Sequence, residues 1–168
     1  MKKKIGILDL NISNLASIYN TIENQGYKAI PFNVNEDLDR FYKIIIPGVG
    51  SYPTAMNKIK NSNLIKKLKI FLEKKKILGI CLGMQIFYKK SYELKQIKGI
   101  GLINEEITKL KFLKKLPNIG YCKIQIVKND KLFKNIENNS YFYFMHSYGS
   151  FDKGTKLNTS IVKYKNKK

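Results

Sequence analysis

The chain has 168 residues, and 43% of them are hydrophobic, which suits a globular domain with a substantial core. Its formal net charge is +20, yet Arg40 is the only arginine and lysine supplies the other basic residues. Arginine is favoured for contacts with bases and phosphates, and these lysines are scattered, so we expect no nucleic-acid partner. No apolar run approaches the ~18 residues that cross a bilayer, so we expect no membrane span. Cys81 and Cys122 stand in unrelated contexts, which predicts no disulfide, no metal site and a reducing, cytoplasmic setting.

The first half of the chain alternates short apolar runs with helical patterns. The predicted strands cover residues 5–8, 27–32, 43–46 and 76–80, and the predicted helices cover residues 13–24, 52–60, 63–75 and 82 to about 91. Such alternation is typical of an α/β fold, with an open, mostly parallel sheet and helices on both faces.

The second half has a different pattern, with candidate strands and only short helical pieces between them. Strands are predicted over residues 102–109, 119–127 and 141–144, with 161–164 as a further candidate. No repeat or linker divides the sequence. We therefore predict one domain over residues 1–168.

A glycine-flanked cysteine follows the predicted strand 76–80. The segment Gly79-Ile80-Cys81-Leu82-Gly83 is the thiol counterpart of the Gly-x-Ser-x-Gly elbow, in which flanking glycines permit a tight turn from a strand into a helix. Such a turn presents the sulfur at a helix N-terminus, whose partial positive charge favours thiolate over thiol. Cys81 is therefore a candidate nucleophile, although the pattern alone leaves open a buried structural cysteine beside packing glycines.

A second glycine-rich segment, Pro47-Gly48-Val49-Gly50, ends the predicted strand 43–46. The carboxyl ends of parallel strands share one edge of a sheet, where open α/β folds place their sites. The backbone N–H groups of this loop could hold the oxyanion formed in thiol acyl transfer. Taken alone, the segment is equally compatible with a plain strand-ending turn.

Together these motifs resemble the class I glutamine amidotransferases, in particular the glutaminase subunits of imidazole glycerol phosphate synthases. That family carries Pro-Gly-Val-Gly after an early strand and Gly-Ile-Cys-Leu-Gly-Met-Gln at its elbow, and both stand unaltered here. Further similar segments are Asn14-Leu15 after Asp9, Gly99-Ile100-Gly101-Leu102, and Tyr141-Phe142-Tyr143-Phe144-Met145-His146-Ser147-Tyr148. The resemblance covers residues 5 to about 164 and implies the flavodoxin-like sandwich of that family.

The resemblance implies hydrolysis of glutamine to glutamate and ammonia. Cys81 would attack the side-chain amide, and the backbone N–H groups of Leu82 and Val49 would hold the oxyanion. The implied substrate-binding residues are Gly48, Gly50, Gln85, Ser147 and Tyr148. The resemblance implies no metal and no cofactor. The ammonia would pass to a (βα)8 barrel synthase subunit in a heterodimer, which makes imidazole glycerol phosphate in histidine biosynthesis.

The sequence also departs from the family pattern. The family completes its catalytic triad with a His-Pro-Glu-Lys-Ser segment near the C-terminus, whereas His146 is the only histidine here and belongs to the aromatic strand motif. We therefore expect the C-terminal end of the fold to be missing and the 168-residue chain to hydrolyse glutamine poorly. Pro117-Asn118-Ile119-Gly120-Tyr121-Cys122 replaces the family's common Pro-His-Met-Gly-Trp-Asn, and we expect no reactive role for Cys122.

Three alternatives remain open from the sequence. One is an amidotransferase subunit that supplies ammonia for amino-sugar formation in surface polysaccharide biosynthesis. Another is a degenerate, non-catalytic subunit that only binds such a synthase. The last is a different hydrolase or chaperone with a cysteine elbow, although the run Leu82-Gly83-Met84-Gln85 after the cysteine favours the amidotransferases.

Overall fold

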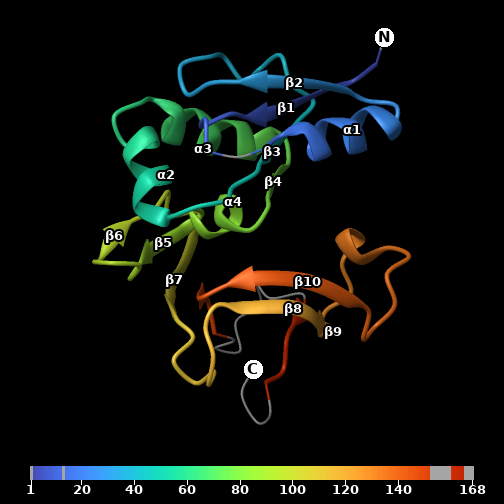
Figure 1. Cartoon of the computed structure of the whole chain (residues 1–168). Helices are drawn as coiled ribbons and strands as arrows, with labels where there is room; N and C mark the ends of the chain where they lie inside the picture. The colour runs from blue at the N-terminus through green and yellow to red at the C-terminus, as the bar shows by residue number, and fades with distance from the viewer. Residues whose placement is uncertain (1, 13, 152–159, 165–168) are drawn as a thin grey trace. The chain divides into compact units, whose positions relative to one another are not determined.

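The computed structural model describes residues 2–12, 14–151 and 160–164. The chain forms two compact units, Met1–Ile107 and Thr108–Lys168 (Figure 1). The single domain expected over residues 1–168 stays a prediction, because the division reflects compactness and not independent folding.

The first unit is built on a sheet of four parallel strands. These are β1 (Lys4–Leu8), β2 (Lys28–Phe32), β3 (Lys43–Ile46) and β4 (Ile77–Gly79). Their order across the sheet is β2-β1-β3-β4 (Figure 1). In the middle of the sheet, Ile5 of β1 is paired with Ala29 of β2 on one side and with Lys43 of β3 on the other. The parallel sheet confirms the α/β fold that the sequence predicts.

Helices cover both faces of this sheet. They are α1 (Ala16–Asn24), α2 (Tyr52–Ile59) and α3 (Leu64–Lys74). Successive side chains of a strand point to opposite faces, so β1 contributes to two separate clusters. Ile5 and Ile7 pack with Ile22 of α1, whereas Leu8 belongs to a larger cluster that includes the buried side chains of α2 and α3. Within the described ranges, no helix is long and apolar enough to cross a membrane.

The prediction of a helix from residue 82 to about 91 is mostly wrong. The helix α4 covers only Leu82–Gln85 and is followed by the strands β5 (Tyr88–Ser91), β6 (Ile97–Lys98) and β7 (Ile103–Lys109). The Ile86 carbonyl accepts the N–H of Ile100 at 2.8 Å, and the Phe87 carbonyl accepts the N–H groups of Leu102 and Ile103 at 2.8 and 2.9 Å. These non-local bonds take the carbonyl groups that a longer helix would use.

The second unit consists mainly of short antiparallel strands. They are β8 (Asn118–Lys123), β9 (Gln125–Ile126), β10 (Tyr141–His146), β11 (Tyr148–Gly149) and β12 (Ser160–Ile161), with a 3-10 helix η1 (Lys131–Phe133). β10 pairs with β8, β12 pairs with β9, and β11 pairs with the last two residues of β7. Strands therefore lie in all four segments where the sequence predicts them, although 119–127 is divided into two.

Candidate active site

Cys81 lies on a sharp turn between β4 and α4. Its φ of 53° and ψ of −117° are strained for a residue with a Cβ atom. The side chain is exposed to solvent. A strained turn that lifts a nucleophile above the end of a strand is the geometry expected of a Gly-x-Cys-x-Gly elbow. The local backbone therefore has the sharp strand-to-helix turn that the sequence predicts, and a buried structural cysteine is excluded.

The two glycines of the elbow are required by close backbone contacts. A Cβ atom added at Gly83 would lie 1.8 Å from the carbonyl oxygen of Ile46, the last residue of β3. One added at Gly79 would lie 2.5 Å from the Cα atom of Met84. Both distances are far below van der Waals contact. The elbow therefore packs directly on the end of β3 and on its own helix.

The loop after β3 packs against the elbow. A Cβ atom added at Gly48 would lie 2.8 Å from the backbone nitrogen of Gly83 and 2.9 Å from the Cβ atom of Leu82. Val49 and Gly50 are exposed beside this contact, and Gly50 has a φ of +99° that favours glycine. The structure thus brings Cys81 together with the two segments expected to surround an oxyanion.

Gln85 lies one helical turn after Cys81. Its backbone N–H donates to the Cys81 carbonyl at 3.0 Å, and its side chain is buried. Residues four apart share a face of a helix, so Gln85 is on the Cys81 side of α4. Its assignment as a substrate-binding residue stays a prediction.

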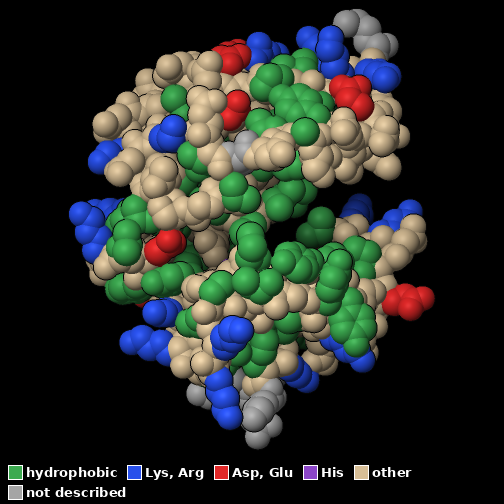
Figure 2. Space-filling view, in the orientation of Figure 1, with side chains coloured by type: hydrophobic (Ala, Val, Ile, Leu, Met, Phe, Trp, Pro, Cys, Tyr) green, Lys and Arg blue, Asp and Glu red, His purple; other side chains and the backbone are tan. Residues whose placement is uncertain are grey.

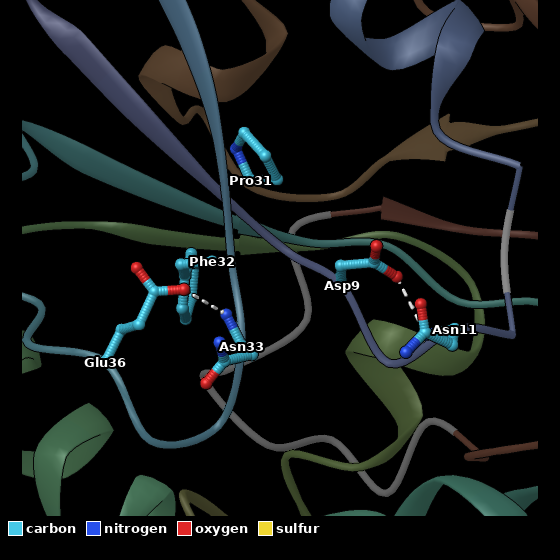
Figure 3. A pocket seen from close by; sticks show the side chains of 6 residues that line it. All are labelled: Asp9, Asn11, Pro31, Phe32, Asn33 and Glu36. Carbon is cyan, nitrogen blue, oxygen red and sulfur yellow. Dashed lines mark hydrogen bonds between the residues drawn. The ribbon is translucent and has the colours of Figure 1, made fainter.

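A separate hollow of about 180 Å³ lies at the same edge of the sheet. It is lined by Asp9, Asn11, Pro31, Phe32, Asn33 and Glu36, which follow or end β1 and β2 (Figure 3). Its carboxylates are engaged locally, since Asp9 accepts the N–H of Asn11 and Glu36 accepts the N–H of Asn33. The Asn33 N–H, with a further contribution from Arg40, lowers the pKa of Glu36. This hollow contains no residue of the elbow or of the loop after β3.

The remaining predicted site residues, Ser147 and Tyr148, lie in the second unit. The Ser147 carbonyl accepts the N–H of Leu110 at 3.0 Å, and the Tyr148 carbonyl lies 2.9 Å from Nδ1 of His146. A carbonyl can only accept, so Nδ1 of His146 carries the hydrogen. Nε2 then accepts from the Asn118 amide, 3.5 Å away. His146 is therefore engaged in holding its own strand.

Cys122 belongs to a polar cluster of the second unit. Its sulfur lies 3.5 Å from the hydroxyl oxygen of Tyr164 and 3.8 Å from the Asn118 amide nitrogen. Burial, with a smaller contribution from Cys122, raises the pKa of Tyr164. The expectation that Cys122 has no reactive role stays a prediction.

One contact at the start of α2 was not predicted from the sequence. The Glu93 carboxylate accepts the backbone N–H of Tyr52 at 3.2 Å, across 41 residues of sequence. The available signal was a lone acidic residue within the lysine-rich segment 89–98. Among the residues that the structure describes, no three His, Cys, Asp or Glu side chains gather as a metal site would require.

Comparisons with known proteins agree with this geometry. The family described as glutamine amidotransferase class-I matches residues 6–167. The chain is 45% identical over 146 residues to imidazole glycerol phosphate synthase subunit HisH of Methanocaldococcus jannaschii, covering 86% of this chain and 72% of that protein. It is 36% identical over 150 residues to the protein of the same name from Lactococcus lactis, covering 87% and 73%. Among solved structures, PurLQS from Thermotoga maritima aligns with a TM-score of 0.67 at 21% identity, covering 91% of this chain and 72% of that chain. An identity this low supports the fold alone.

Proposed function

Because this chain belongs to the class I glutamine amidotransferase family, we propose that it is the glutaminase subunit of an imidazole glycerol phosphate synthase. Its role is then to supply ammonia for histidine biosynthesis. The similarity to HisH proteins over 86% of the chain is the observation that carries this proposal. No observation favours the amino-sugar or non-catalytic alternatives.

In the proposed reaction, the Cys81 thiolate attacks the side-chain carbonyl carbon of glutamine. The carbonyl electrons move to oxygen, and the backbone N–H groups of Leu82 and Val49 stabilise the resulting oxyanion. As this intermediate collapses, the carbon–nitrogen bond breaks and the departing nitrogen takes up a proton from water, so ammonia leaves and a glutamyl thioester remains on Cys81. Water hydrolyses the thioester to glutamate. The strained elbow and the adjoining Gly48 loop support these assignments.

Five further residues are proposed to contact glutamine. Gly48, Gly50 and Gln85 lie beside the elbow in the first unit, and Ser147 and Tyr148 are assigned through the family motif.

We also propose that the 168 residues alone turn glutamine over slowly. Their only histidine, His146, already uses Nδ1 and Nε2 in contacts with Tyr148 and Asn118. Loss of the base from such a triad reduces turnover by several orders of magnitude.

A partner is proposed from an exposed apolar surface of the second unit. One face of the β8–β10 pair carries Ile119, Tyr121, Tyr141, Tyr143 and Met145, each more than half exposed. The rings of Tyr121 and Tyr143 are 5.4 Å apart in an edge-to-face arrangement. We call these five residues the aromatic face. Exposed aromatic surface of this kind is typical of protein interfaces, so we propose that it binds the (βα)8 barrel synthase subunit in a heterodimer.

The decisive experiment is reconstitution with two barrel subunits encoded in the same genome, one from histidine biosynthesis and one that aminates a sugar. Selective binding to the former, together with glutamine-dependent protection of Cys81 from alkylation, would support the proposal. Selective binding to the sugar-aminating subunit would instead favour the amino-sugar alternative.

Two unpaired cysteines and biosynthetic relatives support a cytoplasmic location, for which tagging and fractionation is the test.

A further inference from the structure

The strands β8 and β10 carry a polar cluster on the face opposite the aromatic face. Asn118 and His146 are directly paired across the two strands, so their side chains lie on the same face within reach of each other. Nδ2 of Asn118 lies 3.5 Å from Nε2 of His146. The first residue of β8 therefore meets the last residue of β10 through their side chains.

The Asn118 amide is also held by Tyr164. Its Nδ2 donates to the Tyr164 hydroxyl oxygen at 2.6 Å, and the Tyr164 ring packs against that of Phe112 with the ring centroids 5.7 Å apart. An amide nitrogen carries two hydrogens, so one goes to Tyr164 and the other to His146. The contact with Tyr164 therefore keeps the amide nitrogen directed toward the imidazole.

The other ring nitrogen of His146 holds the backbone of Tyr148. The Ser147 carbonyl accepts the N–H of Leu110 at 3.0 Å, so the next pair of this antiparallel ladder, Tyr148 with Lys109, is not hydrogen-bonded. The Tyr148 carbonyl therefore points away from β7. Nδ1 of His146 donates to it at 2.9 Å. This bond fixes the backbone of the two residues that are assigned to glutamine, Ser147 and Tyr148.

Both contacts of the imidazole require the same tautomer. A neutral histidine ring carries one hydrogen, and the partners of its two nitrogens decide where that hydrogen lies. The Tyr148 carbonyl can only accept, which requires the hydrogen on Nδ1. The Asn118 N–H can only donate, which requires Nε2 without a hydrogen. Asn118 and Tyr148 thus favour one form of the ring together.

We propose that Asn118 is a positioning residue for the glutamine-binding segment Ser147–Tyr148. It selects the His146 tautomer whose Nδ1–H holds the Tyr148 carbonyl, and it acts on the segment only through that ring. This inference rests on the proposed function, and it assigns to substrate binding a residue of β8 that does not itself contact glutamine.

The test has two readouts on the full chain. His146 is the only histidine, so the nitrogen-15 spectrum of the labelled chain identifies the ring nitrogen that carries the hydrogen without ambiguity. The spectrum is recorded at mildly alkaline pH, where a histidine ring is ordinarily neutral. Glutamine affinity is measured as protection of Cys81 from alkylation by iodoacetamide, and alkylation without glutamine controls for thiol reactivity.

We expect the hydrogen on Nδ1 in the original chain. Asn118→Asp keeps the size of the side chain but replaces the donor with an acceptor, so the hydrogen should move to Nε2 and the glutamine affinity should fall about 3- to 10-fold. Asn118→Leu removes the donor without adding a charge. It should populate the Nε2–H form and weaken glutamine similarly, and it serves if the aspartate variant does not fold.

Cys122→Ala is the matched control, because the Cys122 sulfur contacts Asn118 and Tyr164 in the same cluster. It should leave the tautomer unchanged and alter glutamine affinity less than about twofold. An equal loss in this control would overturn the proposal, because any change in the cluster would then act alike.

Two further results would also overturn the positioning role. One is a hydrogen on Nε2 in the original chain, and the other is a tautomer that changes in Asn118→Asp and Asn118→Leu without any change in glutamine affinity. If glutamine does not protect Cys81 in the original chain, the proposed function fails and the positioning role fails with it. The spectrum still reports the tautomer in that case, so the two failures are distinguishable.

Discussion

Cys81 places opposite demands on stability and on chemistry. Its φ of 53° is unfavourable for any residue with a Cβ atom, and such conformations cost about 1–3 kcal/mol. Glycine adopts them without this penalty. The side chain nevertheless is exposed, where a substrate can reach it. The strained turn thus lowers local stability, and it presents the thiol to solvent.

We expect Cys81→Gly to be more stable than Cys81→Ala by about 1 kcal/mol, because alanine keeps the Cβ atom that the turn disfavours. Urea unfolding of both variants measures the difference. The same two substitutions at Cys122, which lies in β8 without a positive φ, should give the opposite order. Equal stabilities at position 81 would contradict the strain.

Tyr52 is a second residue whose chemistry conflicts with its surroundings. Its hydroxyl oxygen is buried, and it has no hydrogen-bond partner among the described residues. Burial raises the pKa of Tyr52 to about 12. The folded state therefore favours the neutral phenol more strongly than the unfolded state does.

The unfolded chain releases the Tyr52 proton near pH 10, whereas the folded chain holds it to about pH 12. Stability associated with this group is therefore complete below pH 10 and is lost as the pH rises toward 12. We expect Tyr52→Phe to equal or exceed the original stability at pH 7, by up to about 1 kcal/mol, and to lose less of it between pH 10 and 12. Urea midpoints across this range measure both effects, and identical pH profiles for the two proteins would contradict the assignment.

At the scale of elements, two lysines of the α3 region hold the segment between β2 and β3. Lys75 Nζ donates to the carbonyl oxygens of Asp39 and Phe41 at 2.8 and 2.7 Å. Lys67 Nζ donates to those of Asn35 and Glu36 at 2.7 and 2.9 Å. The segment has no helix or strand of its own, so these bonds supply part of its order.

We expect Lys75→Met to lower the free energy of unfolding by about 1–3 kcal/mol, because two charge-assisted hydrogen bonds are lost while the apolar stem is retained. Lys69→Met, at an exposed position of α3, should stay within about 0.5 kcal/mol of the original protein. Thermal or urea unfolding measures both. A loss no larger at position 75 than at position 69 would show that the bonds contribute little.

The apolar periodicity of the sequence correctly predicted those helices and strands whose formation depends mainly on local sequence. The strand at 43–46 and the helices α1, α2 and α3 lie within a few residues of their expected bounds, because each has a clear apolar period. The helix prediction failed after Gln85 because the Ile86 and Phe87 carbonyls accept hydrogen bonds from backbone N–H groups of residues 100–103. That pairing is tertiary, and no local propensity reports it.

The same distinction holds for the site. Cys81 and Gly48 were predictable because glycine-flanked motifs mark turns that only certain backbones can make. The Glu93–Tyr52 contact joins residues 41 positions apart, and nothing in the sequence near Glu93 names its partner. Sequence therefore predicts the glycine-flanked turns of the candidate site better than the long-range contacts around them.

At the scale of the whole molecule, charge and apolar surface carry different information. Lysine side chains are spread over both units in the view of Figure 2, with other side chains between them. A net charge of +20 favours solubility, and on the face in this view the lysines do not gather into one patch. The aromatic face is confined to one pair of strands, and it is therefore the better predictor of a partner.

We expect Tyr121→Ala to weaken binding to the barrel subunit by at least about 2 kcal/mol, because Tyr121 is 72% exposed in the centre of the aromatic face and aromatic residues dominate interface energies. Titration calorimetry with the purified barrel measures the change. Tyr27→Ala, at an exposed position of the first unit, is the matched control and should have little effect. Equal losses at both positions would argue against this interface.

The contact between Gly83 and Ile46 also has an evolutionary consequence. With 1.8 Å between an added Cβ and the Ile46 oxygen, position 83 is closed to every other amino acid while the sheet keeps its form, whether or not the protein catalyses. The thiol of Cys81 is exposed, so packing does not restrict its side chain in this way. Among closely related strains, a lineage that keeps the fold but loses catalysis should therefore retain glycine at 83 and accumulate substitutions at 81. Comparing substitutions at these two positions therefore distinguishes selection on structure from selection on catalysis, and a small set of genomes is enough for the comparison.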